Sequence, residues 1–282
     1  MQKAPLFRLT LFLLLASALF SPAAAETVDL TILHINDFHG NLLPKPGKEG
    51  KPATGGMARI AKMVAEEREK NPKGTILLSA GDMFQGTPIS NLFRGRPVIE
   101  TMNRMGFDAM TVGNHEFDWG MEAFQDLRKA ASFPFLSANI LDERGALLPG
   151  VKPYILIRKK GLKIAVIGIT TPETHYATKP ENLKGFRVAA VEKVLPGLIA
   201  KLRKEGAGPV VVLSHLGLDE DRELASKVEG IDLIVGGHSH TEVKTAVTVG
   251  ATRIVQAGYY GQQLGVLAIA VDRESRRVVR CP

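Results

Sequence analysis

The chain has 282 residues, a formal net charge of +7 and one cysteine, Cys281. A single cysteine excludes a fold held together by internal disulfides, and the length is sufficient for one α/β domain with a large core. Basic residues are spread along the chain and stand beside acidic ones such as Glu66 and Glu67. We therefore expect a solvated surface whose positive field favours phosphorylated small molecules, and no groove for a nucleic-acid polymer.

The N-terminal 25 residues have the pattern of a secretory signal peptide. Lys3 and Arg8 are followed by an apolar run at residues 9–20 and by the small residues Ala23, Ala24 and Ala25. The apolar run is shorter than an ordinary membrane span, so a stable membrane anchor is not expected. The pattern predicts cleavage after Ala25 and a periplasmic or extracellular location.

Beyond this leader, short runs rich in Val, Ile and Leu alternate with longer amphipathic stretches. The short runs predict buried strands and the longer stretches predict helices. Such alternation is typical of an α/β fold with largely parallel core strands flanked by helices. In chain order we expect a strand at 28–36, a helix at 57–70, a strand at 75–79, a helix at 88–105, strands at 109–112 and 135–138, a hairpin around 158–163, a helix at 188–204, and strands at 209–213, 231–235 and 265–271.

Five polar motifs follow five of the predicted strands. They are Asp37-Phe38-His39, Gly81-Asp82, Gly113-Asn114-His115-Glu116, Ser214-His215 and Gly237-His238-Ser239-His240. Ligands of open α/β sheets bind beyond the carboxyl ends of the strands, which is where all five motifs fall. If the extended path continues past the strand ends, Asp37 and His39 point to one side, and so do His238 and His240. Together the motifs offer enough oxygen and imidazole ligands for two metal ions.

These motifs resemble those of the calcineurin-like metallophosphoesterases, within them the secreted 5'-nucleotidases and 2',3'-cyclic phosphodiesterases. The resemblance extends over residues 28–272 and includes HINDFHG, the block from Gly81 to Gly120, SANI, GITTPET and QAGYYGQQLG. It implies a metallophosphoesterase-type β-sandwich with two divalent metal ions. Carboxylate and imidazole ligands without thiolate suit zinc, manganese, iron or cobalt, and ligand type alone does not choose among these ions. Of the four we expect zinc or manganese.

The resemblance also implies a role for each motif residue. One metal is expected on Asp37, His39 and His240, a second on Asn114, His215 and His238, with Asp82 bridging the two. A metal-activated water would attack phosphorus in line. His115 would stabilise the transition state or protonate the leaving group, and Asp118 would orient His115. Asp118 has a second interpretation, an acid favoured by the dipole at a helix N-terminus.

Three functions stay open at this stage. The first is a secreted phosphoester hydrolase acting on a small phosphorylated substrate, with a nucleotide favoured. The second is a thiosulfate-ester hydrolase of sulfur oxidation, and the third is a non-catalytic metal-binding module. Full-length members of the resembling branch carry a second, C-terminal domain that binds the nucleoside. We expect residues 26–282 to form the catalytic domain alone, without that second domain.

Three other positions receive interpretations of their own. Glu116 is expected to be structural rather than a ligand, although it belongs to the third motif. His34 shares a strand face with Asn36 and is expected in the core. The Pro- and Gly-containing segment at residues 44–56 is expected to be a loop that borders the active site and carries specificity.

Overall fold

The computed structural model describes residues 26–47 and 53–281. The predicted signal peptide and residues 48–52 of the predicted loop lie outside the described residues. Across the part that is described, none of the helices combines the length and the apolar character needed to cross a membrane.

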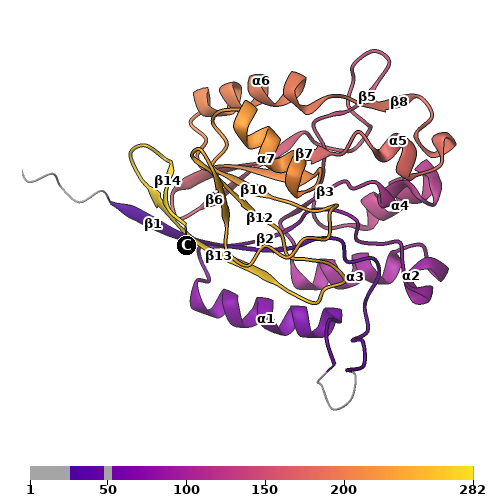
Figure 1. Ribbon diagram of the computed structural model, residues 1–282. Helices are drawn as coiled ribbons and strands as arrows, with labels where there is room; N and C mark the ends of the chain where they lie inside the picture. The colour runs from indigo at the N-terminus through magenta and orange to yellow at the C-terminus, as the bar shows by residue number, and fades with distance from the viewer. Residues whose placement is uncertain (1–25, 48–52, 282) are drawn as a thin grey trace, which may run out of the picture.

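Two six-stranded sheets form the centre of the molecule (Figure 1). The first has the order β14-β13-β1-β2-β3-β4 and the second has the order β11-β12-β10-β9-β7-β6. In the first sheet β1 to β4 run parallel, and β13 and β14 add antiparallel pairs at one edge. In the second sheet β7, β9, β10 and β12 run parallel, and β6 and β11 are antiparallel at the two edges. The largely parallel core strands agree with the prediction from the sequence. The first sheet contains β1 (Thr27–Ile35), β2 (Thr75–Ser79), β3 (Ala109–Thr111), β4 (Phe135–Leu136), β13 (Gly265–Asp272) and β14 (Val278–Arg280). The second contains β6 (Tyr154–Lys159), β7 (Leu162–Thr170), β9 (Val210–His215), β10 (Leu233–Val235), β11 (Val247–Val249) and β12 (Thr252–Val255).

Helices cover the outer face of each sheet, which gives four layers (Figure 1). A short two-stranded ribbon of β5 and β8 lies beside them. The described helices and ribbon strands are α1 (Met57–Lys70), α2 (Pro88–Leu92), α3 (Arg96–Met105), α4 (Gly120–Ala130), α5 (Thr174–Ala177), α6 (Val191–Lys204), α7 (Leu218–Lys227), two 3-10 turns at His115–Phe117 and Pro180–Leu183, β5 (Ile140–Asp142) and β8 (Phe186–Val188).

Strand β1 shows why four layers form. In its second half, apolar side chains are buried on both faces, so both faces must be covered there. Leu30 and Ile32 belong to the apolar cluster between the two sheets, whereas Leu33 and Ile35 belong to the cluster shared with α1 and α3. A third cluster joins the second sheet to α6 and α7. The predicted β-sandwich flanked by helices is confirmed.

Two predicted helices differ from those observed. The stretch at 88–105 is divided between α2 and α3, because Gly95 adopts the left-handed conformation with a φ of 79° and Pro97 starts a new helix. The stretch at 188–204 begins with the end of β8, and its helix starts only at Val191. Both differences concern boundaries and leave the layer order unchanged.

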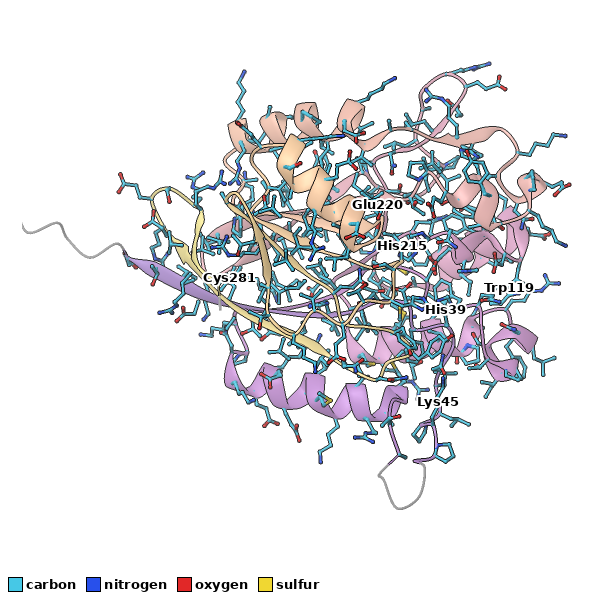
Figure 2. All side chains as sticks on the ribbon, viewed as in Figure 1. His39, Lys45, Trp119, His215, Glu220 and Cys281 are labelled. Carbon is cyan, nitrogen blue, oxygen red and sulfur yellow. The ribbon has the colours of Figure 1, made fainter. Side chains whose placement is uncertain are left out.

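The carboxyl ends of the parallel strands lie at one end of the molecule. Figure 2 shows His39, which follows β1, and His215, which ends β9, lying toward this end although they come from different sheets. Cys281 lies toward the other end. The sheet order therefore brings together motifs that are about two hundred residues apart in the sequence.

His34 is a core residue, as expected. It pairs with Gly265 of β13, and any Cβ at Gly265 would collide with the His34 ring. The side chain is 2% exposed, and among the described residues its Nδ1 atom has no hydrogen-bond partner. Burial lowers the pKa of His34 to about 4, so the imidazole is neutral at neutral pH.

Acid should destabilise the protein through His34. Its pKa lies near 6.5 in the unfolded chain and near 4 in the folded one, so the unfolded state binds the extra proton in this interval. The free energy of unfolding is then fully retained above about pH 6.5 and falls toward pH 4, by up to about 3 kcal/mol. Denaturant unfolding at several pH values should show a weaker pH dependence for His34→Gln, and an unchanged dependence would contradict this assignment.

Candidate metal centre

The ligand side chains form two groups that face one another. The first group is Asp37, His39 and His240, and the second is Asp82, His215 and His238. Within each group the ligand atoms lie within 4.8 Å of one another. Asp82 also connects the groups, since its Oδ2 atom is 3.0 Å from Nε2 of His215 and 4.0 Å from Nε2 of His39. Asp82 is therefore a carboxylate that lies between the two groups.

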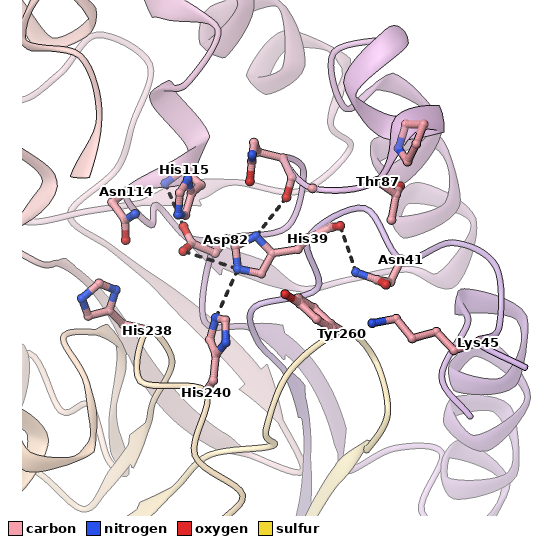
Figure 3. Close-up of a pocket in the computed structure, with 13 residues that line it drawn as sticks. His39, Asn41, Lys45, Asp82, Thr87, Asn114, His115, His238, His240 and Tyr260 are labelled. Atoms are coloured by element: carbon pink, nitrogen blue, oxygen red, sulfur yellow. Dashed lines mark hydrogen bonds and ion pairs between the residues drawn. The ribbon is translucent and has the colours of Figure 1, made fainter. Parts of the chain in front are cut away.

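The first group is arranged for a cation. Nε2 of His240 lies 3.3 Å from Oδ1 of Asp37. The same atom lies 3.2 Å from Nε2 of His39 (Figure 3). Nδ1 of His39 is 2.9 Å from the carbonyl oxygen of Gln85. When Nδ1 donates to that carbonyl, Nε2 keeps its lone pair and directs it toward His240 and Asp82. Such an orientation fits a metal ligand.

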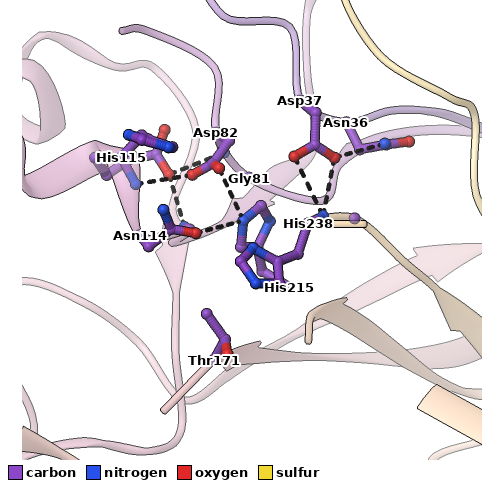
Figure 4. A network of polar contacts seen from close by, with 12 residues as sticks. Asn36, Asp37, Gly81, Asp82, Asn114, His115, Thr171, His215 and His238 are labelled. Atoms are coloured by element: carbon purple, nitrogen blue, oxygen red, sulfur yellow. Dashed lines mark hydrogen bonds and ion pairs between the residues drawn. The ribbon is translucent and has the colours of Figure 1, made fainter. Parts of the chain in front are cut away.

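The second group repeats this arrangement (Figure 4). Nδ1 of His215 is 2.6 Å from the carbonyl oxygen of Ala80, and its Nε2 is 3.2 Å from Oδ1 of Asn114. Asn114 therefore lies beside this group. Nε2 of His238 lies 3.0 Å from Oε2 of Glu173, a contact that sequence reasoning missed. The signal was present in the matched segment GITTPET, which contains Glu173.

The backbone at the ligands is not extended, so the predicted alternation past the strand ends is wrong. Asp37, His39, His238 and His240 all have positive φ, from 48° to 73°. Tight turns instead bring each pair together. The amide of His238 donates to Oδ2 of Asp37 at 2.9 Å, and the amide of His39 donates to the carbonyl of Asp82 at 3.0 Å. Non-glycine residues adopt this conformation rarely, and they cluster at functional sites.

Glu116 connects two of the motifs through hydrogen bonds to their backbone amides. Its buried carboxylate accepts hydrogen bonds from the amides of Asp82 at 3.0 Å, Met83 at 2.8 Å and Gly113 at 2.6 Å. A Cβ at Gly113 would collide with the Asp82 carboxylate, so only glycine permits this approach. These contacts agree with the structural interpretation of Glu116.

His115 and Asp118 form the expected pair. Nδ1 of His115 lies 2.7 Å from Oδ2 of Asp118, and the His115 ring meets the His39 ring edge to face at 5.2 Å. The hydrogen bond to Asp118 raises the pKa of His115 to about 9. Asp118 thus contacts the imidazole that it was expected to orient. Asn114, the residue before His115, faces His215 instead.

The pKa values of the ionisable groups inside the centre depend strongly on one another. Burial acts to raise the pKa of Asp82, but the imidazoles of His215, His115 and His39 outweigh it and hold that pKa well below its usual range. Burial likewise acts to lower the pKa of His215, yet Asp82 and Asp37 raise it to about 10. For His39, burial prevails and lowers the pKa. A buried carboxylate surrounded by imidazoles is a site that favours positive charge.

A cavity of about 730 Å³ opens onto both groups. Figure 3 shows that it also reaches Asn41, Lys45, Thr87 and Tyr260. Lys45 belongs to the segment that was expected to border the site, and this expectation holds for its described part. Tyr260 was missed, although it lies in the matched segment QAGYYGQQLG and follows β12, another strand whose carboxyl end faces the site.

Glu116 offers a test of the loop geometry. In Glu116→Gln one acceptor oxygen is replaced by an NH₂ group that opposes a backbone amide, so we expect a loss of about 1–3 kcal/mol in the free energy of unfolding. Ala123→Gly on α4 serves as a control of comparable size, because it destabilises without touching the loops. Metal binding measured by calorimetry should weaken in Glu116→Gln and not in the control; equal binding in both would contradict the role of Glu116.

Comparison with known proteins gives the chain a family. The calcineurin-like phosphoesterase family matches residues 30–242. A snake venom 5'-nucleotidase of Crotalus adamanteus is 37% identical over 276 residues, which cover 88% of this chain and 46% of that protein. The chain thus spans about half the length of the curated relatives it matches.

Solved structures with a similar fold include members of the same group of enzymes by name. A 5'-nucleotidase precursor of Thermus thermophilus has a TM-score of 0.81 at 32% identity, over 90% of this chain and 54% of that one. A sulfate thiohydrolase of Thermus thermophilus has a TM-score of 0.79 at 26% identity, over 90% and 55%. With its layered fold and its paired ligand groups, the chain belongs to the calcineurin-like phosphoesterase family.

Proposed function

We propose that the protein is a secreted, dinuclear metal-dependent phosphoester hydrolase of the 5'-nucleotidase type. One observation supports this most. The two ligand groups share Asp82 and open into the same cavity as the His115–Asp118 pair. A metal-binding module without catalysis would need the ligands but has no use for an oriented imidazole beside them.

The donor set fits two divalent ions. Asp37, His39 and His240 would hold one, Asn114, His215 and His238 the other, and Asp82 both. Carboxylate, amide and imidazole donors suit zinc or manganese. When bound, such a pair neutralises phosphate charge and lowers the pKa of a water molecule for in-line attack.

His115 would act on the leaving group. Its ring lines the cavity, and Asp118 keeps Nδ1 occupied, so Nε2 is the atom that can deliver a proton or a hydrogen bond. Asn114 would position the phosphate from the neighbouring residue. Phosphoryl transfer depends on positioning and on neutralised charge, so no nucleophilic serine or cysteine is needed.

The substrate that we propose is a small phosphoester, with nucleotides favoured. The cavity volume of about 730 Å³ lies within the range of small-molecule sites. Relatives that match the chain are named 5'-nucleotidases. The leader pattern at residues 1–25 supports action in the periplasm or outside the cell.

Thiosulfate-ester hydrolysis is the second candidate. It is favoured by the likeness to a sulfate thiohydrolase at 26% identity. The two candidates differ in the bond that is broken, because phosphoester hydrolysis releases phosphate and thiosulfonate hydrolysis releases sulfate. The higher identity to 5'-nucleotidases favours the phosphoester.

Steady-state hydrolysis of p-nitrophenyl phosphate, AMP and 2',3'-cyclic AMP tests the proposal, with protein loaded with manganese or zinc. His115→Asn should lower kcat by about 10²–10⁴ while metal content stays unchanged. Asp82→Asn should lower metal content as well as kcat, because the carboxylate between the groups is lost. Full activity in both variants would refute the mechanism, and sulfate release from a thiosulfonate without phosphate release from any ester would favour the second candidate.

Asp118→Asn should change the pH profile. The Asp118 hydrogen bond raises the pKa of His115, so its removal lowers that pKa and the protonated imidazole is lost at lower pH. The basic limb of the kcat profile should therefore move to lower pH than in the wild type. A basic limb at the same pH in both proteins would show that His115 is not the acid.

A further inference from the structure

Lys45 lines the cavity at a distance from the ligand groups. Figure 3 shows its side chain extending toward the Tyr260 ring, on the far side of Tyr260 from Asp82 and His115. Its Nζ atom is 4.0 Å from the centre of that ring, which is a cation–π contact. The backbone of Lys45 is fixed by two hydrogen bonds with Thr54, of 2.8 and 3.0 Å. The backbone of Lys45 is therefore fixed, and its exposed side chain carries the ammonium group to the Tyr260 ring.

Tyr260 is itself attached to the metal centre. Its amide donates to the carbonyl of Asp37 at 2.7 Å. Its ring meets the rings of His39 at 5.7 Å and Tyr259 at 4.6 Å, both nearly perpendicular. Gly55 packs so close that a Cβ there would lie 3.1 Å from the Tyr260 carbonyl. Tyr260 thus lies between Lys45 and His39 and contacts both side chains.

The cavity lining carries one acidic side chain and one lysine, and of these two only the acidic one belongs to the ligand groups. Asp82 is the one carboxylate among the lining residues, and Lys45 is the one lysine or arginine. Asp82 belongs to the ligand groups and would be neutralised by metal. Within residues 26–47 and 53–281, Lys45 forms no ion pair with a carboxylate. If the metals bind the scissile phosphate, the ammonium group of Lys45 is the positive charge of this lining that remains without a counter-ion.

We propose that Lys45 and Tyr260 form a subsite for a second anionic group, so that the preferred substrates are phosphoesters whose leaving group carries a further phosphate or carboxylate. This inference rests on the proposed function, and it specifies the substrate class. Lys45 is a specificity residue here, because it would contact the substrate away from the bond that breaks.

A stacking site for a nucleobase is the alternative use of Tyr260. The ammonium group of Lys45 lies over one face of the ring, so a base could stack there only by displacing it. Other parts of the ring meet His39, His240 and Tyr259. An anion needs no such displacement, because it approaches the ammonium group from the cavity.

Two isosteric aryl esters test the proposal. In 4-carboxyphenyl phosphate and 4-carbamoylphenyl phosphate the phosphate and ring are the same, and only the remote group differs in charge. Lys45→Met should raise KM for the carboxylate ester about fivefold with kcat unchanged, because remote contacts act equally on bound substrate and transition state. For the amide ester KM should change less than twofold. Lys45→Arg should restore the low KM.

Lys73→Met provides the matched control. Lys73 is an exposed lysine just before β2, at the end of the sheet away from the ligands, and its loss changes the net charge equally. An equal effect of Lys45→Met and Lys73→Met, or an equal effect of Lys45→Met on both esters, would overturn the subsite.

Failure of the proposed function is distinguishable from failure of the subsite. If the metal-loaded wild type hydrolyses neither ester, the proposed function fails. Calorimetric binding of the two esters then still decides the subsite. Tighter binding of the carboxylate ester, lost in Lys45→Met, supports it, and equal binding of both esters refutes it.

Discussion

The buried carboxylate of Asp82 connects the two halves of this protein. Asp82 follows β2 of the first sheet and faces His215 at the end of β9 in the second sheet, with Nε2 and Oδ2 3.0 Å apart. Asp82 is 2% exposed and His215 is fully buried. A buried charge is costly unless a counter-charge is close. The two sheets must therefore meet at this point, and the remainder of the centre is arranged around that contact.

The turns around Asp82 have the rigidity that a metal centre needs. Five of the ligand residues adopt positive φ, which costs free energy at each position. Glu116 offsets part of this cost, because its carboxylate accepts hydrogen bonds from three backbone amides of the loops that carry Asp82 and Gly113. Backbone carbonyls of Gln85 and Ala80 orient two of the imidazoles. The ligands are thereby held in position by the fold.

The same network extends from the metal centre into the cavity. Tyr260 is hydrogen-bonded to Asp37 through its amide and contacts His39 through its ring, while Lys45 rests on Tyr260. The side chain that we propose to contact a substrate's leaving group is therefore linked, through Tyr260, to residues that are expected to hold metal. Specificity and catalysis would then depend on one rigid arrangement rather than on two independent ones.

Much of the architecture could be read from local patterns. Apolar runs predicted the strands, because a strand covered on both faces has to be largely apolar, as residues 210–213 of β9 are. The five motifs predicted which residues gather at the strand ends, since parallel strands present their carboxyl ends together. The contact between His115 and Asp118 also followed, because a turn brings residues three apart within reach.

Other features were decided only by tertiary structure. The left-handed turns at Asp37 and His238 are imposed by hydrogen bonds between segments 201 residues apart, which no local pattern reports. The break between α2 and α3 depends on how Gly95 packs against Phe84 and Leu127. Glu173 and Tyr260 contact the candidate ligands, and Lys45 lines the cavity beside them, although all three come from segments without a ligand motif. By itself the sequence determined the layers and the chemistry of the ligands; the geometry came from tertiary packing, because side chains distant in sequence must satisfy one another's charges and hydrogen bonds in space.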